Sequence, residues 1–163
     1  MEFMELTYFE ELNIPFKKYQ SIDYEKLKEL IKDKKKVLII APRRLGKTRF
    51  IVEEVTSNDI VLVLTSRYRS VFIDNVKELK NFTPTVYSTA HDFATGNMLL
   101  PVETIFVDEC FYIPEHIQGI IKFGLQAKKI ICICSKHNDY PDEKIDDYRK
   151  NGFEIINAPL KFY

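Results

Sequence analysis

Short apolar runs, each followed by a polar or glycine-containing segment, recur along the chain. Four of these runs are rich in β-branched residues and almost continuously apolar, at residues 37–40, 60–64, 104–107 and 130–134. Continuous rather than alternating apolar sequence is typical of parallel strands that helices cover on both faces. Weaker runs at residues 85–87 and 153–156 are further strand candidates. The pattern therefore predicts a buried, mostly parallel sheet.

Helical patterns fill the segments between these runs, at residues 24–32, 47–55, 69–79 and 114–126. The first of them has one apolar stripe, formed by Tyr24, Leu27, Leu30 and Ile31. A last helix is predicted to begin at Pro141 and to end near Lys150, with Gly152 in the left-handed position just past its end. Alternating strands and helices indicate a three-layer α/β fold with right-handed crossovers. In such folds, ligands bind at the carboxyl ends of the strands.

Length and composition fit a single domain. The 163 residues are 45% hydrophobic and 13% aromatic, which is enough for one substantial core. We expect one domain over residues 1–163, with an N-terminal segment at 1–35, a core at 36–163 and no nuclease domain. The 24 basic residues balance the 24 acidic ones, so the net charge gives no argument for binding nucleic acid or a membrane. No apolar stretch approaches the roughly 18 residues of a membrane span, and we expect an intracellular, cytoplasmic protein.

Cysteines and a lysine run have both a structural and a functional interpretation. Cys110, Cys132 and Cys134 are predicted to be buried, reduced thiols, because no paired C-x2-C spacing supports a zinc site that would also use His137. The run formed by Lys32, Lys34, Lys35 and Lys36 is typical of a solvated loop, with contact to DNA as the alternative.

The segment from Ala41 to Thr48 matches a phosphate-binding loop of the form G-x4-G-K-[ST], with alanine in the first position. It follows a predicted strand and opens a predicted helix, which is the context that the motif requires. Backbone N–H groups of such a loop and the positive end of the helix dipole hold phosphate, while the lysine and the hydroxyl complete the grip. A basic, solvated loop is the alternative. The predicted ATP-contacting residues are Pro42, Arg44, Leu45, Gly46, Lys47 and Thr48.

Two features of this loop depart from the common motif. Alanine reaches the backbone angles available to glycine only with strain, so Ala41 predicts that the loop closes with a different conformation. Arg43 and Arg44 each carry a guanidinium that can pair with two phosphate oxygens and stabilise charge on a transferred phosphoryl group. We expect one of the two to face the site and the other to remain at the surface.

Asp108 and Glu109 end an apolar run further along the chain. At the tip of a strand, Asp108 can hold Mg2+ directly or through water beside Thr48. Glu109 can orient and deprotonate a water molecule for attack on the γ-phosphate. A solvated acidic loop is the alternative for the pair alone. The pair follows Gly46-Lys47-Thr48 in the chain, and this order favours an ATP site. In that site, Lys47 would act on the phosphates and Glu109 on the water.

Three segments resemble the ATPase domain of the large terminase subunit, the DNA-packaging motor of tailed bacteriophages, which is related to helicase-like ATPases. Residues 43–48 are similar to the terminase phosphate loop, which commonly lacks the first glycine and carries an arginine ahead of Gly-Lys-Thr. Residues 108–114 are similar to the terminase acidic motif with the apolar residues and proline that follow it. Residues 16–20 resemble the adenine-recognition motif, in which the glutamine amide pairs with the base edge.

This resemblance implies a RecA/helicase-like P-loop NTPase fold and a viral ATPase that uses ATP and Mg2+. It implies that Tyr19 and Gln20 bind the base and that Arg43 enters the catalytic pocket in cis. In the same way it makes Thr48 and Asp108 the metal ligands and Glu109 the catalytic carboxylate. A coupling motif is expected at residues 134–138. The implied partners are double-stranded DNA, further copies of the chain in a ring, and portal or nuclease chains, with no membrane.

Other functions are compatible with the same motifs. A helicase-like ATPase that nucleic acid stimulates, unrelated to packaging, is the second enzymatic interpretation. The third is a nucleotide-dependent switch or assembly module that binds ATP without turning it over, because Ala41 distorts the loop. A P-loop kinase is disfavoured, because Asp108 and Glu109 supply a base directed at water.

Overall fold

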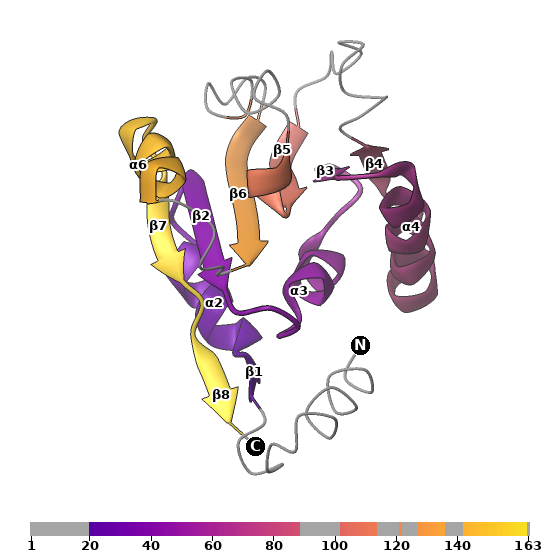
Figure 1. The fold of residues 1–163 in the computed structure, drawn as a ribbon. Helices are drawn as coiled ribbons and strands as arrows, with labels where there is room; N and C mark the ends of the chain where they lie inside the picture. The colour runs from indigo at the N-terminus through magenta and orange to yellow at the C-terminus, as the bar shows by residue number, and fades with distance from the viewer. Residues whose placement is uncertain (1–19, 89–101, 114–120, 122–126, 136–141, 163) are drawn as a thin grey trace.

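The structure, a computed structural model, describes residues 20–88, 102–113, 121, 127–135 and 142–162. These residues form a six-stranded parallel sheet with helices on both faces and a separate pair of antiparallel strands (Figure 1). In chain order, the elements are β1 (Gln20–Ile22), α2 (Tyr24–Ile31), β2 (Lys36–Ala41), α3 (Lys47–Glu54), β3 (Ile60–Val63), α4 (Ser66–Lys80), β4 (Thr85–Ser88), β5 (Val102–Asp108), η3 (Cys110–Tyr112), β6 (Ala127–Ser135), α6 (Asp142–Lys150), β7 (Glu154–Asn157) and β8 (Leu160–Phe162).

The strands of the main sheet lie in the order β4-β3-β5-β6-β2-β7, and all neighbours are parallel. Strand β2 lies inside the sheet, with Val37 in register with Ile131 of β6 on one side and Glu154 of β7 on the other. The six strands predicted from apolar runs are confirmed. Because the strands are parallel, their carboxyl ends meet at one edge, where the arrowheads of β2, β5 and β6 point in Figure 1.

Both faces of the sheet are buried. Helices α2, α3 and α4 cover one face with core residues such as Leu27, Phe50 and Phe72. Helix α6 and the short helix η3 cover the other, through residues such as Tyr148 and Phe111. Alternate residues of β2 enter the two cores, which is the physical reason that its sequence is apolar at successive positions.

The helices predicted at residues 24–32, 47–55 and 69–79 are confirmed, with two adjustments. Helix α2 begins after Asp23, whose carboxylate accepts a hydrogen bond from the Lys26 N–H at 3.2 Å. Leu30 was expected in the apolar stripe of this helix, but it is 47% exposed and does not belong to the buried residues. Helix α4 begins at Ser66, earlier than predicted, because the Thr65 hydroxyl caps it. Gly152 has φ +87°, as expected past the end of α6. The helix predicted at 114–126 lies outside the described residues except for Ile121, which is helical and buried, and Pro141 also lies outside them.

Cys110, Cys132 and Cys134 form no disulfide and are buried in the core that α6 covers, where the structural interpretation placed them. Burial raises the pKa of the Cys110 thiol well above its ordinary value, so this thiol stays protonated. Among the described residues, no group of His, Cys, Asp and Glu side chains is arranged to hold a metal on its own, and His137 lies outside them.

In the lysine run at residues 32–36, the side chains of Lys34 and Lys36 contact neighbouring structure. Lys34 Nζ lies 2.9 Å from a Glu154 carboxylate oxygen, and Lys36 Nζ donates to the Asn151 carbonyl at 3.3 Å. Lys32 and Lys35 are exposed, as a solvated loop requires. Across the described part of the chain, every helix is too short or too polar to cross a membrane.

The strands β1 and β8 form a small antiparallel pair beside the segment that follows β2. Gln20 is in register with Phe162. The Ile22 N–H donates to the Leu45 carbonyl at 3.1 Å, and the Ala158 N–H donates to the Ile40 carbonyl at 2.8 Å. The pair is therefore tied by its backbone to the end of β2 and to the loop before α3.

Candidate functional site

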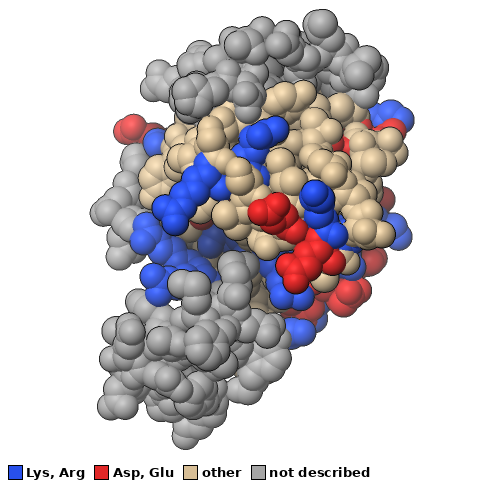
Figure 2. Space-filling view, turned by 90° about the vertical axis from the view of Figure 1, so that its right-hand side faces the viewer, with Lys and Arg blue, Asp and Glu red and all other residues tan. Residues whose placement is uncertain are grey.

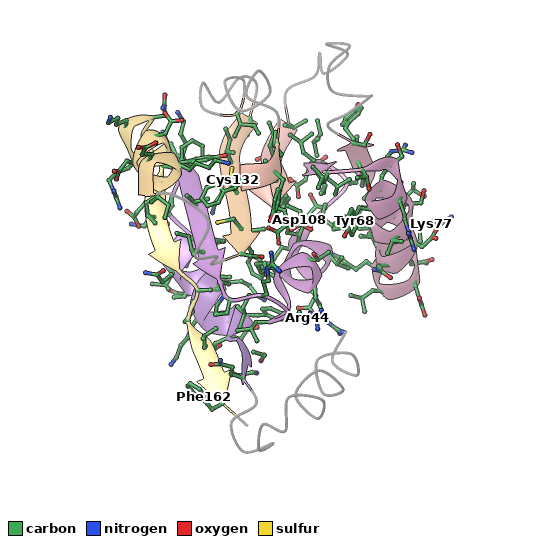
Figure 3. All side chains as sticks on the ribbon, in the orientation of Figure 1. Arg44, Tyr68, Lys77, Asp108, Cys132 and Phe162 are labelled. Carbon is green, nitrogen blue, oxygen red and sulfur yellow. The ribbon has the colours of Figure 1, made fainter. Side chains whose placement is uncertain are left out.

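A pocket of about 350 Å³ opens at the carboxyl ends of the central strands. Lys47 and Thr48 line it from the start of α3, Asp108 and Glu109 from the end of β5, and Ser135 from the end of β6. Asp108 lies at the centre of the molecule in Figure 3, with Tyr68 of α4 on one side and Arg44 below. The structure thus brings the two sequence motifs into one pocket, as their order along the chain predicted.

The phosphate loop takes its unusual backbone angles at Arg44 and Gly46, not at Ala41. Ala41 is the fully buried last residue of β2, in register with Ser135, and it is not among the residues with positive φ. Arg44 has φ +60° and Gly46 has φ +92°. The strain expected from the alanine is therefore absent from that position. The left-handed conformation falls instead on Arg44, where it costs a non-glycine residue about 1 kcal/mol.

Lys47 is held inside the pocket at 7% exposure. Its Nζ donates to the Pro42 carbonyl at 3.2 Å and lies 3.9 Å from the Glu109 carboxylate. The ammonium thus bridges the beginning of the loop and the acidic pair. A buried charge of this kind is retained where an anionic ligand or a carboxylate compensates it.

Thr48 and Asp108 are joined directly. The Thr48 hydroxyl donates to Asp108 Oδ2 at 2.8 Å, while the other carboxylate oxygen, Oδ1, is buried and has no hydrogen-bond partner within the described part of the chain. A hydroxyl beside a carboxylate with an unsatisfied oxygen is a suitable donor set for Mg2+, which prefers hard oxygen ligands. Thr48 and Asp108 therefore fit the metal-binding roles that the sequence suggested for them.

Burial raises the pKa of Asp108 from its ordinary value of 3.8 to about 6, although the hydrogen bond from Thr48 acts in the opposite direction. The native state then binds one proton more than the unfolded state between about pH 4 and pH 6. The contribution of Asp108 to stability is therefore lost as the pH rises through this window. At neutral pH, the buried carboxylate is a source of instability in the metal-free protein.

Replacing Asp108 with asparagine is expected to raise the free energy of unfolding by about 1–3 kcal/mol at pH 7 in EDTA, because the uncharged amide removes the cost of burying a charge. Denaturant unfolding at pH 4.5 and pH 7 should show this gain shrinking at the lower pH. The matched control is Asp59→Asn, because the buried Asp59 carboxylate accepts from Thr56 N–H, Thr56 Oγ1 and Thr104 N–H at 2.8–3.0 Å and its replacement should destabilise the protein. A loss of stability in Asp108→Asn like that in the control would contradict the prediction.

Glu109 is oriented by Ser135 and by its own backbone. Its φ of +53° is left-handed, an uncommon conformation for glutamate that tends to occur at functional sites. The Ser135 hydroxyl donates to Oε1 at 2.8 Å, and the Ser135 N–H donates to Oε2 at 3.3 Å. The carboxylate is thus fixed at both oxygens at the rim of the pocket, 30% exposed and accessible to a water molecule.

Both arginines of the loop line the pocket and are exposed, whereas the sequence suggested that only one would face it. Leu45 does not line the pocket: its side chain is buried in the core, and its carbonyl accepts from the Ile22 N–H of β1. Pro42 contributes its carbonyl to Lys47. Within the expected base-binding segment, Tyr19 and residues 16–18 lie outside the described residues, and Gln20 opens β1. Of the expected coupling motif, residues 136–138 also lie outside them.

Two residues that line the pocket were given another role, or none, from the sequence. Ser135 was expected only as part of a coupling motif. Tyr24, expected only as part of an apolar stripe, does not line the pocket, but its hydroxyl donates to the Gly46 carbonyl at 2.8 Å. Tyr68, 61% exposed, reaches the pocket from the first turn of α4. Thr65, which caps α4, comes just after strand β3, and Tyr68 follows it by three residues. A side chain this close to the end of a strand could have been placed at the carboxyl edge of the sheet from the sequence.

Comparisons with solved structures describe the fold. The helicase domain of Hef from Pyrococcus furiosus matches with a TM-score of 0.62 and 18% identity, over 84% of this chain and 38% of the other. The large terminase of a thermophilic bacteriophage matches with a TM-score of 0.57 and 14% identity, over 88% of this chain and 46% of the other. The fold is that of a P-loop NTPase. The resemblance to large terminases drawn from the motifs therefore has a structural counterpart.

The likeness is one of architecture. This chain spans less than half the length of either solved structure. The sequence matches no protein-family model and no curated protein. At these identities, a shared fold does not establish a shared activity, and the activity must be argued from the pocket itself.

Proposed function

We propose that this protein binds ATP with Mg2+, hydrolyses it, and uses the hydrolysis to move DNA, as a viral packaging motor does. The observation that carries the proposal is the junction of the two motifs, in which Thr48 lies 2.8 Å from Asp108 while Lys47 and Glu109 approach the same pocket. Phosphoryl transfer depends mainly on positioning and on neutralising charge, and these four side chains supply both.

Each side chain has a distinct part in the proposed reaction. Lys47 leaves the Pro42 carbonyl and binds phosphate oxygens, while backbone N–H groups at the start of α3 complete the cradle. Thr48 and Asp108 would hold Mg2+, which when bound would neutralise charge on the phosphates. Glu109 orients the attacking water and accepts its proton.

Arginines complete the charge balance in this proposal. Arg43 and Arg44 line the pocket, and a guanidinium there stabilises the charge that develops on the transferred phosphoryl group. Following the terminase resemblance, we assign this role to Arg43. We assign base recognition to Tyr19 and Gln20, a role supported by the backbone contact between β1 and the loop at Leu45.

Nucleic acid as the partner rests on three observations. The motifs resemble those of a DNA-packaging motor, and the solved structures that share the fold are a terminase and the helicase domain of Hef. The face that carries α4 displays a broken band of Lys and Arg side chains, and a group of Asp and Glu side chains lies next to it (Figure 2). Arg67, next to the pocket-lining Tyr68 in the first turn of α4, is exposed, whereas the Arg69 Nε–H donates to the Val86 carbonyl at 2.7 Å.

A helicase-like ATPase that single strands stimulate is the second candidate. It is favoured by the similarity to the helicase domain of Hef, whose TM-score of 0.62 exceeds that of the terminase. The two candidates share the ATP site and differ in the form of nucleic acid that they recognise.

Phosphate release from ATP tests the proposal in four conditions: with Mg2+, with EDTA, and with Mg2+ plus either duplex or single-stranded DNA. We expect turnover only with Mg2+, because without the cation the Asp108 carboxylate would add a negative charge beside the phosphates. We also expect duplex DNA to stimulate it severalfold. Stimulation by single strands alone would favour the helicase-like candidate, and ATP binding without turnover in every condition would favour a switch or assembly module.

A further inference from the structure

The hydroxyl of Tyr24, the first residue of α2, contacts the backbone of the phosphate loop. It donates to the Gly46 carbonyl at 2.8 Å. The same carbonyl accepts the first helical hydrogen bond of α3, from the Phe50 N–H at 3.0 Å. Both acceptor positions of the Gly46 oxygen are therefore occupied, one from inside α3 and one from α2.

The preceding carbonyl of the loop is held by the neighbouring element in the same way. The Leu45 oxygen accepts from the Ile22 N–H at 3.1 Å, at the end of β1. In a trans peptide unit, the C=O and the following N–H point in opposite directions. Fixing the carbonyls of Leu45 and Gly46 toward β1 and α2 therefore turns the N–H groups of Gly46 and Lys47 the other way. Both of these residues line the pocket.

Tyr24 is well placed to hold this geometry, because its own position is fixed. Its ring packs against Phe50, with ring centroids 5.7 Å apart. The Asp23 side chain caps α2, and the Asp23 N–H donates to the Pro159 carbonyl at 2.8 Å. A Cβ added at Gly46 would collide with the Tyr24 hydroxyl, so the two residues are packed without a gap.

We propose that Tyr24 is a positioning residue for phosphate binding: its hydroxyl fixes the peptide unit between Gly46 and Lys47 so that the Lys47 N–H faces the phosphates. Tyr24 does not contact the nucleotide itself. The proposal rests on the proposed ATP site and adds a determinant of its affinity that lies outside the phosphate-loop and acidic motifs.

The test is Tyr24→Phe, which keeps the ring on Phe50 and removes only the hydroxyl. Losing one hydrogen bond that pre-orients a phosphate donor should weaken binding about 5- to 10-fold. Titration with ATP and with inorganic tripolyphosphate, which lacks a base, should show the same factor for both ligands. In steady-state assays, KM should rise by a similar factor with kcat changed less than about twofold, because the contact acts equally on the ground state and the transition state.

A control separates positioning from a general loss of stability. Asp23→Ala removes the cap of the same helix and should lower the melting temperature at least as much as Tyr24→Phe, since it leaves an N–H at the start of the helix without its side-chain acceptor. Because it leaves the Tyr24 hydroxyl in place, it should leave tripolyphosphate affinity within about twofold of the parent. The inference is overturned if both variants weaken tripolyphosphate equally, or if Tyr24→Phe weakens ATP alone.

Failure of this inference can be told apart from failure of the ATP site. If the parent binds neither ATP nor tripolyphosphate, the proposed function is wrong. If the parent binds both and Tyr24→Phe binds them with unchanged affinity, the site stands and the positioning role of Tyr24 is wrong.

Discussion

Glu109→Gln is expected to lower ATP turnover by about 100-fold or more, because a positioned general base contributes roughly 10²–10⁴-fold to such reactions. Glutamine has nearly the same shape and keeps one oxygen that can accept the hydrogen bond from the Ser135 hydroxyl, which is 2.8 Å from the glutamate. It cannot accept the proton of the attacking water. ATP affinity should change by about threefold at most, with any change toward tighter binding, since a negative charge near the phosphates is removed.

Single-turnover hydrolysis and equilibrium ATP binding measure the two effects separately. The matched control is Glu103→Gln on the same strand, because Glu103 is exposed at the opposite end of β5 and pairs with Lys128 at 2.9 Å. Its turnover should equal that of the parent. Turnover in Glu109→Gln within about threefold of the parent would show that another group activates the water.

Lys47→Ala is expected to weaken ATP binding by about 100-fold or more. The ammonium is buried at 7% exposure, so its hydrogen bonds to phosphate form where water does not compete. Losing one or two charge-assisted hydrogen bonds of about 1.5–3 kcal/mol each corresponds to this factor. The expected loss exceeds the effect of removing the Tyr24 hydroxyl, because a charge on the ligand is left without its counter-charge.

Isothermal titration with ATP and Mg2+ measures this effect, and Arg49→Ala is its control. Arg49 lies on the same helix, is also basic, and pairs with Glu53 at 3.2 Å on the exposed side of α3. It should bind ATP like the parent. ATP affinity unchanged in Lys47→Ala would mean that the loop does not hold the phosphates.

The fold could be predicted from sequence where burial leaves a local pattern. Strand β2 is apolar at successive positions because both of its faces enter a core, and this pattern is visible without any partner. The order of the strands in the sheet, in contrast, leaves no local pattern in the sequence. That β6 lies between β5 and β2 depends on pairing between distant segments, and nothing within 130–134 specifies a neighbour.

The site divides in the same way. Gly46-Lys47-Thr48 and Asp108-Glu109 could be found because each group of residues performs its chemistry at a fixed local spacing. The contacts of Tyr24 with Gly46 and of Ser135 with Glu109 join residues on different elements, so only the folded chain brings them together. Backbone strain was expected at Ala41 because the motif usually has glycine at that position. In this loop the left-handed backbone angle occurs at Arg44, and the motif gives no information on that position.

The pairing of β2 also has a consequence for the order in which the chain can fold. Lys36 of β2 pairs with Ile130, and Val37 pairs with Glu154, so both neighbours of this strand are made late in synthesis. Until β6 emerges from the ribosome, this apolar strand has two unpaired edges, and only the face that α2, α3 and α4 cover can be shielded. Contacts between segments so far apart are slow to form and leave intermediates prone to aggregation. Strand β2, which leads into the phosphate loop, is thus synthesised early but gains its neighbouring strands late. A nascent chain interrupted before Ala127 would contain the loop but neither of the strands that pair with β2.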